Sequence, residues 1–371
     1  MTIDRHEIRA TIAGQPVRVL TAETTLDRGW APYAQGRLTI VAPAMLELLD
    51  PRRREQVTVR LVRRFSESES VAQVSARHAG KTVGQVSAQH AGKTVDQMSA
   101  AYRNAWNPAG PHGAARPRYL VGWLTSAQRT FDDPNTYEIE WCGDEERAIT
   151  RLAATKSWSP NASTVRGIVA NALGFAGLDQ TLGGSVDADV PVDEDGRSPV
   201  WLAGVSCWDY LDPIVSACGM RLYADERGDW QLVDADETVG TVELGDAVTA
   251  GGEAWATDNK RFYDHAVILY EWETQAGVRR SSIDSYALGS VAGYTERVQG
   301  RPAGDGRAQA IVERAQKRAL AQQWEAIADY SIHPGQVATI TPAGVSGVVD
   351  AVTFSYPDAR AKISLIDVST L

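Results

Sequence analysis

The stretch Val200-WLAGVSCWDYLDPIVSACGMRLYADERGDWQLV-Asp234 shows most directly how this chain folds. Ser206 and Asp209 have the spacing of a helix N-cap and the third helical residue, and Gly219 stands where such a helix would stop. The apolar positions between them recur at helical spacing: Trp208, Leu211, Ile214, Val215 and Cys218. Two short apolar runs then flank an acidic turn at residues 225–229. The stretch predicts a helix over residues 206–218 followed by a β-hairpin.

A second helical pattern lies upstream, at residues 161–174. Its apolar residues fall on one face: Val165, Ile168, Val169, Ala172 and Leu173. Ser163 or Asn161 is the expected N-cap, and Gly174 is the expected end. The acidic residues at 187–196 lack the order of an EF-hand loop, so we expect a solvated loop there and leave calcium binding open. We therefore expect a small α+β domain of two helices and a hairpin at residues 154–236.

The regions on either side alternate apolar and polar residues, as strands with one buried face do. Residues 1–65 and 117–153 are expected to form one tube-like β barrel, and residues 237–371 a second. The second includes a long helix at about residues 307–325, with an apolar face made of Ile311, Val312, Ala315, Ala319 and Trp324. The predicted fold class is α+β and β-rich, with two tube-like β barrels.

Residues 66–116 contain a repeat of 12 residues in three copies and form an insertion in the first barrel. Each copy opens with Ser70, Thr82 or Thr94 and has Gln three residues later, which is the spacing of a capping box. Gly80 and Gly92 stand where short helices would end. We expect three brief helices on an exposed loop, where changes of length are tolerated.

The overall composition is that of a folded protein that does not wrap around nucleic acid. The chain has 43% hydrophobic and 23% charged residues, the ordinary globular balance. Its formal net charge of -10 disfavours a phosphate-binding surface, which needs clustered Lys and Arg. We expect no signal sequence and no membrane anchor, because no stretch approaches the roughly 20 apolar residues of a membrane span. The three cysteines form no CxxC pair and are expected to be buried thiols: Cys142, Cys207 and Cys218.

Motifs that would indicate catalysis or a cofactor are incomplete, so we predict no catalytic residue, no metal site and no cofactor. The Gly-Lys-Thr triplets ending at Thr82 and Thr94 lack the earlier Gly of a phosphate loop. No two His residues have the spacing of HExxH. Ser206 and Ser346 lack the last Gly of the nucleophile motif GxSxG, so we interpret Ser206 as a helix cap and Ser346 as a turn residue.

The stretch from Val200 to Asp234 resembles the central segment of the tail hub or minor tail proteins of phages that infect actinobacteria. The repeat that leads to Tyr102 and Trp106-Asn-Pro is similar to the variable insertion of these baseplate-hub-like proteins. The long helix, His333-Pro-Gly-Gln-Val337 and the closing Gly347–Val352 run are similar to the hub C-terminus. The extra repeat copies depart from the family pattern.

This resemblance implies a structural virion protein that is not an enzyme. The family fold has two tube-like barrels per chain and assembles as a homotrimeric ring that closes the distal end of the tail tube. The implied partners are the tail tube or distal tail protein, the tape measure protein and other tail-tip or receptor-binding proteins, with DNA passing through the lumen only in transit. The implied location is the tail tip of the virion, after synthesis in the host cytoplasm. The net charge of -10 per chain predicts an acidic lumen.

Two other functions stay open from the sequence. The 11 Trp residues permit a carbohydrate-binding receptor or adhesion module, in which some Trp rings would be exposed for stacking. Trp141, Trp208, Trp230 and Trp324 lie on apolar phases and are expected in the core, whereas Trp106 and Trp158 are less certain. A cell-wall hydrolase would need a pair of carboxylates in a cleft, and the sequence singles out no such pair.

Overall fold

The structure is a computed structural model. It describes residues 2–67, 117–150, 157–160, 162–190, 199–245, 247–253, 262–273, 278–299, 302, 306–319 and 321–370. The repeat helices, Trp106 and most of the acidic loop of the small domain lie outside these residues. Within them, no helix is long and apolar enough to cross a membrane.

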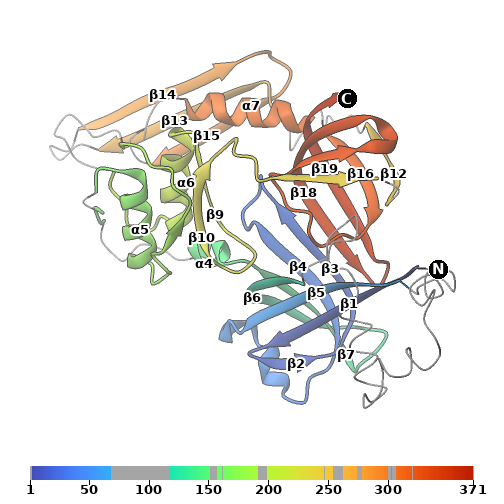
Figure 1. The fold of residues 1–371 in the computed structure, drawn as a ribbon. Helices are drawn as coiled ribbons and strands as arrows, with labels where there is room; N and C mark the ends of the chain where they lie inside the picture. The colour runs from blue at the N-terminus through green and yellow to red at the C-terminus, as the bar shows by residue number, and fades with distance from the viewer. Residues whose placement is uncertain are drawn as a thin grey trace, which may run out of the picture.

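A sheet of 13 strands forms the larger part of the molecule, in two groups that we call lobe 1 and lobe 2 (Figure 1). Lobe 1 has seven strands: β1 (Thr2–Ile12), β2 (Gln15–Val17), β3 (Val19–Asp27), β4 (Ala34–Val41), β5 (Gln56–Glu67), β6 (Arg118–Arg129) and β7 (Thr136–Cys142). Lobe 2 has six: β11 (Thr241–Leu244), β12 (Val248–Glu253), β16 (Gln322–Ile327), β17 (Val337–Ile340), β18 (Val345–Tyr356) and β19 (Arg360–Thr370). The short 3-10 helices of the lobes are η1 (Leu46–Leu49), η2 (Pro51–Arg53) and η3 (Thr341–Ala343).

The strands of the two expected barrels lie in one continuous sheet over one apolar core. The order runs β12-β16-β19-β18-β3-β4-β7-β6-β5-β1-β2, with β17 and β11 attached beside β18. One core cluster contains buried residues of both lobes, among them Leu38 and Phe354. β18 makes this possible because its 12 residues serve two partners: the first part pairs with β17, and the part from Ala351 onward pairs with β3. Bulges in the β18–β19 ladder, on either side of Val349, accompany the change of partner.

Each lobe curls back on itself, because its outermost strands are neighbours in the sequence. Only Arg18 separates β2 from β3, and three residues separate β11 from β12. Such short links hold consecutive strand ends within roughly 7 and 14 Å of each other. The described residues form no ladder between β2 and β3 or between β11 and β12, so hydrogen bonds do not close either lobe into a complete barrel.

The small unit lies beside the lobes, on the left side of Figure 1. It contains α5 (Val165–Phe175), β8 (Leu182–Gly183), α6 (Cys207–Ala217), β9 (Met220–Ala224) and β10 (Trp230–Asp234). The five expected residues of α5 are all buried. Its cap, however, is Thr164, whose hydroxyl accepts from Gly167 N–H, so the choice of Ser163 or Asn161 was wrong by one residue or more. In α6 the Ser206 cap is confirmed. Its buried residues include Cys207 and Tyr210, which were not expected there, whereas Trp208, which was expected, is only partly buried.

The third unit, here called the α7 unit, pairs a three-stranded sheet with the helix α7 (Arg307–Ala319). Its strands are β13 (His265–Glu273), β14 (Arg279–Ala287) and β15 (Gly293–Gln299), and Val312 of α7 packs on Ile268 and Tyr270. Residues 237–371 thus contribute to two units. The expected helix to residue 325 is too long: residues 322–327 form β16, with Trp324 in the strand. The ladders to β12 and β19 on its two sides outweigh the helical spacing of the apolar residues.

Candidate assembly site

The joint between the lobes is the β3–β18 ladder, which pairs six residues of each strand from Asp27↔Ala351 to Ala22↔Tyr356. Leu26 and Val352 are partners in this ladder, and both are completely buried. On the opposite face, the hydroxyl groups of Thr25 and Thr353 share a hydrogen bond of 2.9 Å. The joint is therefore a regular part of the sheet, with an apolar inner face and a hydroxyl outer face.

Arg318 of α7 connects the two strands at one end of the joint. Its guanidinium lies 3.2 Å from Asp27 Oδ1, at the end of β3, and 3.1 Å from Asp350 Oδ2, in β18. It also donates to the carbonyl of Gly29 at 3.2 Å. These three charged side chains are 11 to 16% exposed, so the cation neutralises two carboxylates that water reaches poorly. A Cβ on Gly29 would overlap the guanidinium, so a larger residue here would displace the end of the Arg318 side chain.

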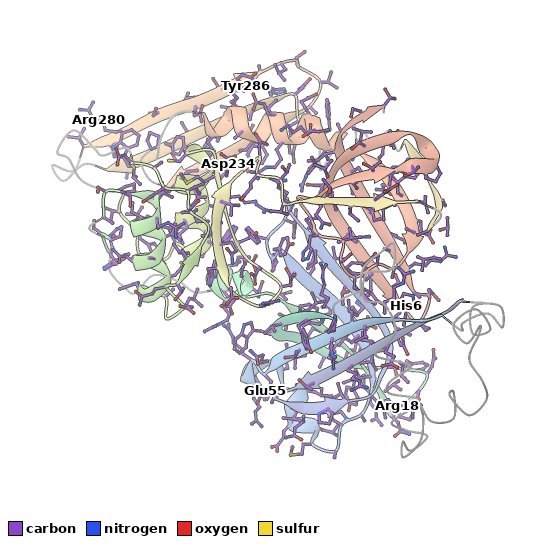
Figure 2. The ribbon with its side chains drawn as sticks, viewed as in Figure 1. His6, Arg18, Glu55, Asp234, Arg280 and Tyr286 are labelled. Atoms are coloured by element: carbon purple, nitrogen blue, oxygen red, sulfur yellow. The ribbon has the colours of Figure 1, made fainter. Side chains whose placement is uncertain are left out.

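The loop after β3 is also tied to the small unit. Arg28 N–H donates to the Asp350 carbonyl at 2.8 Å, and its guanidinium donates to the Ala235 carbonyl just after β10. Arg221 of β9 donates to the Arg28 carbonyl at 3.0 Å. Burial, followed by the charge of Arg28, lowers the pKa of Arg221 to about 10, which still leaves it protonated at neutral pH. Figure 2 shows Asp234, the last residue of β10, on the side of the small unit that faces the lobes.

Two further contacts connect lobe 1 with lobe 2. Arg118 of β6 is 5% exposed and donates to the Ile332 carbonyl at 2.7 Å, with its guanidinium over the Phe354 ring. Burial lowers the pKa of Arg118. His6 of β1 hydrogen-bonds the hydroxyl of Tyr330 at 3.2 Å, and Figure 2 shows His6 where the two lobes meet. These contacts connect the two lobes in addition to the hydrogen bonds of the β3–β18 ladder.

The outer surface of the joint, here called the joint face, is polar across six adjacent strands. It comprises Glu138 and Glu140 of β7, Arg37 and Thr39 of β4, Thr21, Glu23 and Thr25 of β3, Thr353 and Ser355 of β18, Arg360 and Lys362 of β19, and Glu325 of β16. All of them are exposed or half-buried.

Most cations of the joint face are paired. Arg37 lies 2.8 Å from Glu138 and 2.7 Å from Glu140, and the hydrogen bond to Glu140 raises its pKa. Arg360 lies 3.5 Å from Glu325 and donates to the Thr249 hydroxyl at 2.6 Å. A guanidinium that is already bonded to carboxylates is a poor phosphate ligand. The joint face is thus hydrophilic without being a basic patch.

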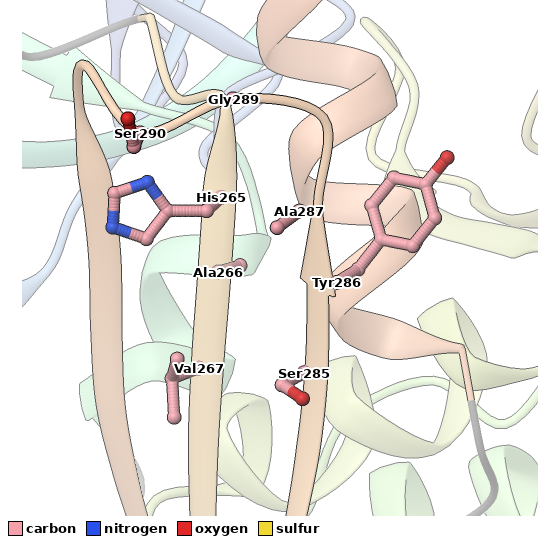
Figure 3. A pocket seen from close by; sticks show the side chains of 8 residues that line it. All are labelled: His265, Ala266, Val267, Ser285, Tyr286, Ala287, Gly289 and Ser290. Atoms are coloured by element: carbon pink, nitrogen blue, oxygen red, sulfur yellow. The ribbon is translucent and has the colours of Figure 1, made fainter.

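A shallow hollow of about 220 Å³ on the α7 unit has residue types of a catalytic triad at one end (Figure 3). Asp264 lies 2.9 Å from His265 Nδ1, and Ser290 is at the same end of the hollow. Asp264 also accepts from the backbone N–H groups of Val291 and Ala292. Burial raises the pKa of Asp264, but these two bonds and the one with His265 outweigh it and bring the pKa to about 2. Among the described contacts, no hydrogen bond joins Ser290 to His265. Asp264 therefore serves to shape the loop between β14 and β15, and the nucleophile–base contact of a catalytic triad is missing.

The residues that the sequence singled out for chemistry have structural positions. Ser206 caps α6 by accepting from Asp209 N–H at 3.0 Å, whereas Ser346 lies inside β18 and was wrongly expected in a turn. Burial raises the pKa of Cys207 to about 12 and that of Cys142 to about 11, so both thiols are protonated at neutral pH. Cys142 and Cys218 are only partly buried. The described part of the chain has no group of three or more His, Cys, Asp or Glu side chains that could hold a metal ion.

The sequence predicted the burial of only some of the Trp side chains. Trp141 and Trp230 are buried as expected, and Trp201 is buried as well. Trp158 is partly buried and stacks on Phe175 at 4.6 Å between ring centres. Among the described Trp residues, Trp30 has the one large exposed ring, at 62%. A single exposed ring does not form a row of aromatic surfaces on which carbohydrate rings could stack.

Sequence reasoning missed the charged residues of the joint, although one signal was available. Asp350 interrupts the apolar alternation of β18 between Val349 and Val352, and a carboxylate within a buried strand needs a partner. Its partner, Arg318, is 32 residues away on α7, and the sequence gives no reason to choose it among the other arginines.

Comparisons with known proteins add the fold relationship. No known protein family profile matches the chain, and no curated protein matches it by sequence. Two solved structures match it along nearly its whole length. One is a tail protein from Neisseria meningitidis MC58, with 10% identity, a TM-score of 0.52, and coverage of 98% of this chain and 96% of that one. The other is the 43 kDa tail protein of prophage MuSo2 from Shewanella oneidensis, with 12% identity, a TM-score of 0.53, and coverage of 97% and 98%.

The chain has a tail-protein fold. Because both coverages exceed nine-tenths, the likeness includes the lobes, the small unit and the α7 unit together. The tail-protein fold therefore accounts for the arrangement of units around the joint, and the low identity limits the likeness to that fold.

Proposed function

We propose that this chain is a structural tail hub, or minor tail, protein of a bacteriophage, and that it is not an enzyme. The observation that carries the proposal is the β3–β18 joint, which connects two curled lobes of one chain in one sheet. The shared fold with two tail proteins supports a place in the virion tail. The resemblance of residues 200–234 supports an actinobacterial host.

Each lobe acts as one tube-like unit, so three chains supply the six units of a sixfold tail tube. A heterologous contact repeated three times closes a ring. This homotrimer closes the distal end of the tube at the tail tip, after synthesis of the chain in the host cytoplasm. Its neighbours are the tail tube or distal tail protein, the tape measure protein, and other tail-tip or receptor-binding proteins.

The joint face lines the lumen through which DNA passes in transit. Its hydroxyl groups and paired charges present no row of free cations to grip the phosphate backbone. The net charge of -10 per chain gives the ring an overall negative potential, which opposes adhesion of DNA. The joint face therefore lets double-stranded DNA move along the lumen without binding to it.

Imaging of the chain together with its tail partners tests the ring. The expected result is a threefold ring with a central channel, and a ring of two, four or five copies would contradict the proposal. Labelling tests the lumen: Thr353→Cys should react with a bulky polyethylene glycol maleimide in the free chain and be protected in the ring. Ser281→Cys, on the exposed strand β14, is the matched control and should react in both. Equal labelling of Thr353→Cys in ring and free chain would exclude the joint face from the lumen.

A further inference from the structure

Glu145 is a completely buried carboxyl group between lobe 1 and the small unit. It is the first residue of α4 (Glu145–Thr150), and two residues separate it from the end of β7. One of its oxygens, Oε1, accepts hydrogen bonds from Tyr33 N–H at 3.1 Å and from Ala224 N–H at 2.9 Å. Tyr33 leads into β4 of lobe 1, and Ala224 ends β9 of the small unit. A single oxygen atom therefore holds backbone groups of both units.

The second oxygen of Glu145 is in a different situation. Oε2 is buried and has no hydrogen-bond partner among the described residues. It lies so close to Gly143 that a Cβ there would come within 2.8 Å. When Glu145 is ionised, its charge is thus stabilised on one oxygen only. An ionised carboxylate that is buried without full compensation is costly, and the cost disappears when it takes up a proton.

Among the residues that the structure describes, the charged groups around Glu145 do not supply a counter-ion. Burial, and then the negative charge of Asp144, raise the pKa of Glu145 to about 7, against the effect of the backbone hydrogen bonds. Asp144 is itself held by Trp123 Nε1–H and Arg147. Cys142, on β7, is a neutral thiol at this pH.

In the described parts of the small unit and lobe 1, the neighbouring side chains also leave Glu145 without a cation. On the lobe 1 side, burial raises the pKa of the Tyr33 phenol, which stays neutral. On β9, Arg221 donates to the Arg28 carbonyl and lies 4.1 Å above the Tyr223 ring, so its charge is directed elsewhere. On α6, which packs against α4, the acidic Asp209 is exposed.

We propose that Glu145 is a proton-sensitive latch between lobe 1 and the small unit: its neutral form keeps the two units docked, and its ionisation loosens them. Because the pKa in the folded chain lies above the usual value of 4.5, the stabilisation is complete below about pH 4.5 and is lost as the pH rises through about 7. The bond from Val121 N–H to the Glu226 carbonyl, at 2.7 Å, and those that Arg28 and Arg221 donate to backbone carbonyls also connect the two units. Ionisation therefore loosens the contact without separating the units.

Hydrogen exchange on the full chain, followed by mass spectrometry at pH 6 and pH 8.5 and corrected for the intrinsic rate, tests the latch. We expect peptides containing Tyr33 and Ala224 to lose about tenfold more protection at pH 8.5 than peptides from the β3–β18 joint. Glu145→Gln, which is neutral at both pH values, should abolish that difference. Glu313→Gln, on the exposed side of α7, is the control and should behave as wild type.

The wild-type chain alone can already overturn the proposal. If the Tyr33 and Ala224 peptides of the wild-type chain are equally protected from hydrogen exchange at both pH values, Glu145 is not a latch. This result does not depend on whether Glu145→Gln folds. Asp144→Asn gives a second check, because removal of the neighbouring negative charge should move the midpoint of the loss to lower pH. A midpoint that does not move, or a pH dependence that persists in Glu145→Gln, would assign the titration to another group.

Discussion

Replacement of Arg318 by Ala should weaken the joint between the lobes more than any change at an exposed ion pair. The change leaves Asp27 and Asp350 facing each other without the guanidinium that lies 3.2 and 3.1 Å from them. Removal of one partner from a buried ion pair typically costs about 3 to 5 kcal/mol of unfolding free energy. At about 2.1 cal/mol/K per residue, the unfolding entropy of a 371-residue chain is roughly 0.8 kcal/mol/K, so Tm should fall by about 4 to 6 °C.

Thermal unfolding of Arg318→Ala beside Arg37→Ala measures this effect. Arg37 also contacts two carboxylates, but its side chain is 61% exposed, and exposed ion pairs contribute little to stability. Arg37→Ala should therefore melt close to wild type. Equal losses for the two variants would refute the role of Arg318 as the cation of the joint.

Three other changes test the remaining assignments. Trp201→Ala removes a fully buried ring from the core of the small unit and should lower the unfolding free energy, measured in urea, by about 3 to 5 kcal/mol. Trp208→Ala changes a partly buried site and should lower it clearly less. The reverse order would mean that the buried face of α6 is misassigned. Thr164→Ala should cost about 1 kcal/mol by loss of the α5 cap, and Ser163→Ala should be near neutral. Deletion of residues 82–93, one repeat unit, should move Tm by only a few degrees, and loss of soluble protein would show that the unit belongs to a core or an interface.

The sequence predicted the buried face of α5 and the cap of α6 correctly because the signals there are local. The α6 cap joins Ser206 to Asp209, three residues apart, and the buried face of α5 repeats within 11 residues. Such hydrogen bonds and periodicities are complete within one or two helical turns, so the residues that decide them are adjacent in the sequence. The same reasoning placed the α5 cap at Ser163 or Asn161 because several residues there can cap, and only the backbone conformation of Thr164 selects among them.

The joint could not be predicted because its partners are distant in the chain. Thr25 and Thr353 are 328 residues apart, and alternation in β3 or β18 shows which side chains are buried without showing which strand lies alongside. For the same reason residues 322–327 carry a helical spacing of apolar residues and yet form a strand, since β12 and β19 complete their backbone hydrogen bonds.

By itself, then, the sequence determined the secondary structure wherever a cap or a period was local, together with the β-rich class and the acidic charge. The tertiary structure decided that two sets of strands share one sheet, that Arg318 is the cation between Asp27 and Asp350, and that Glu145 is enclosed between two units. The physical reason is that strand pairing and the burial of charge depend on groups brought together only when the whole chain is folded.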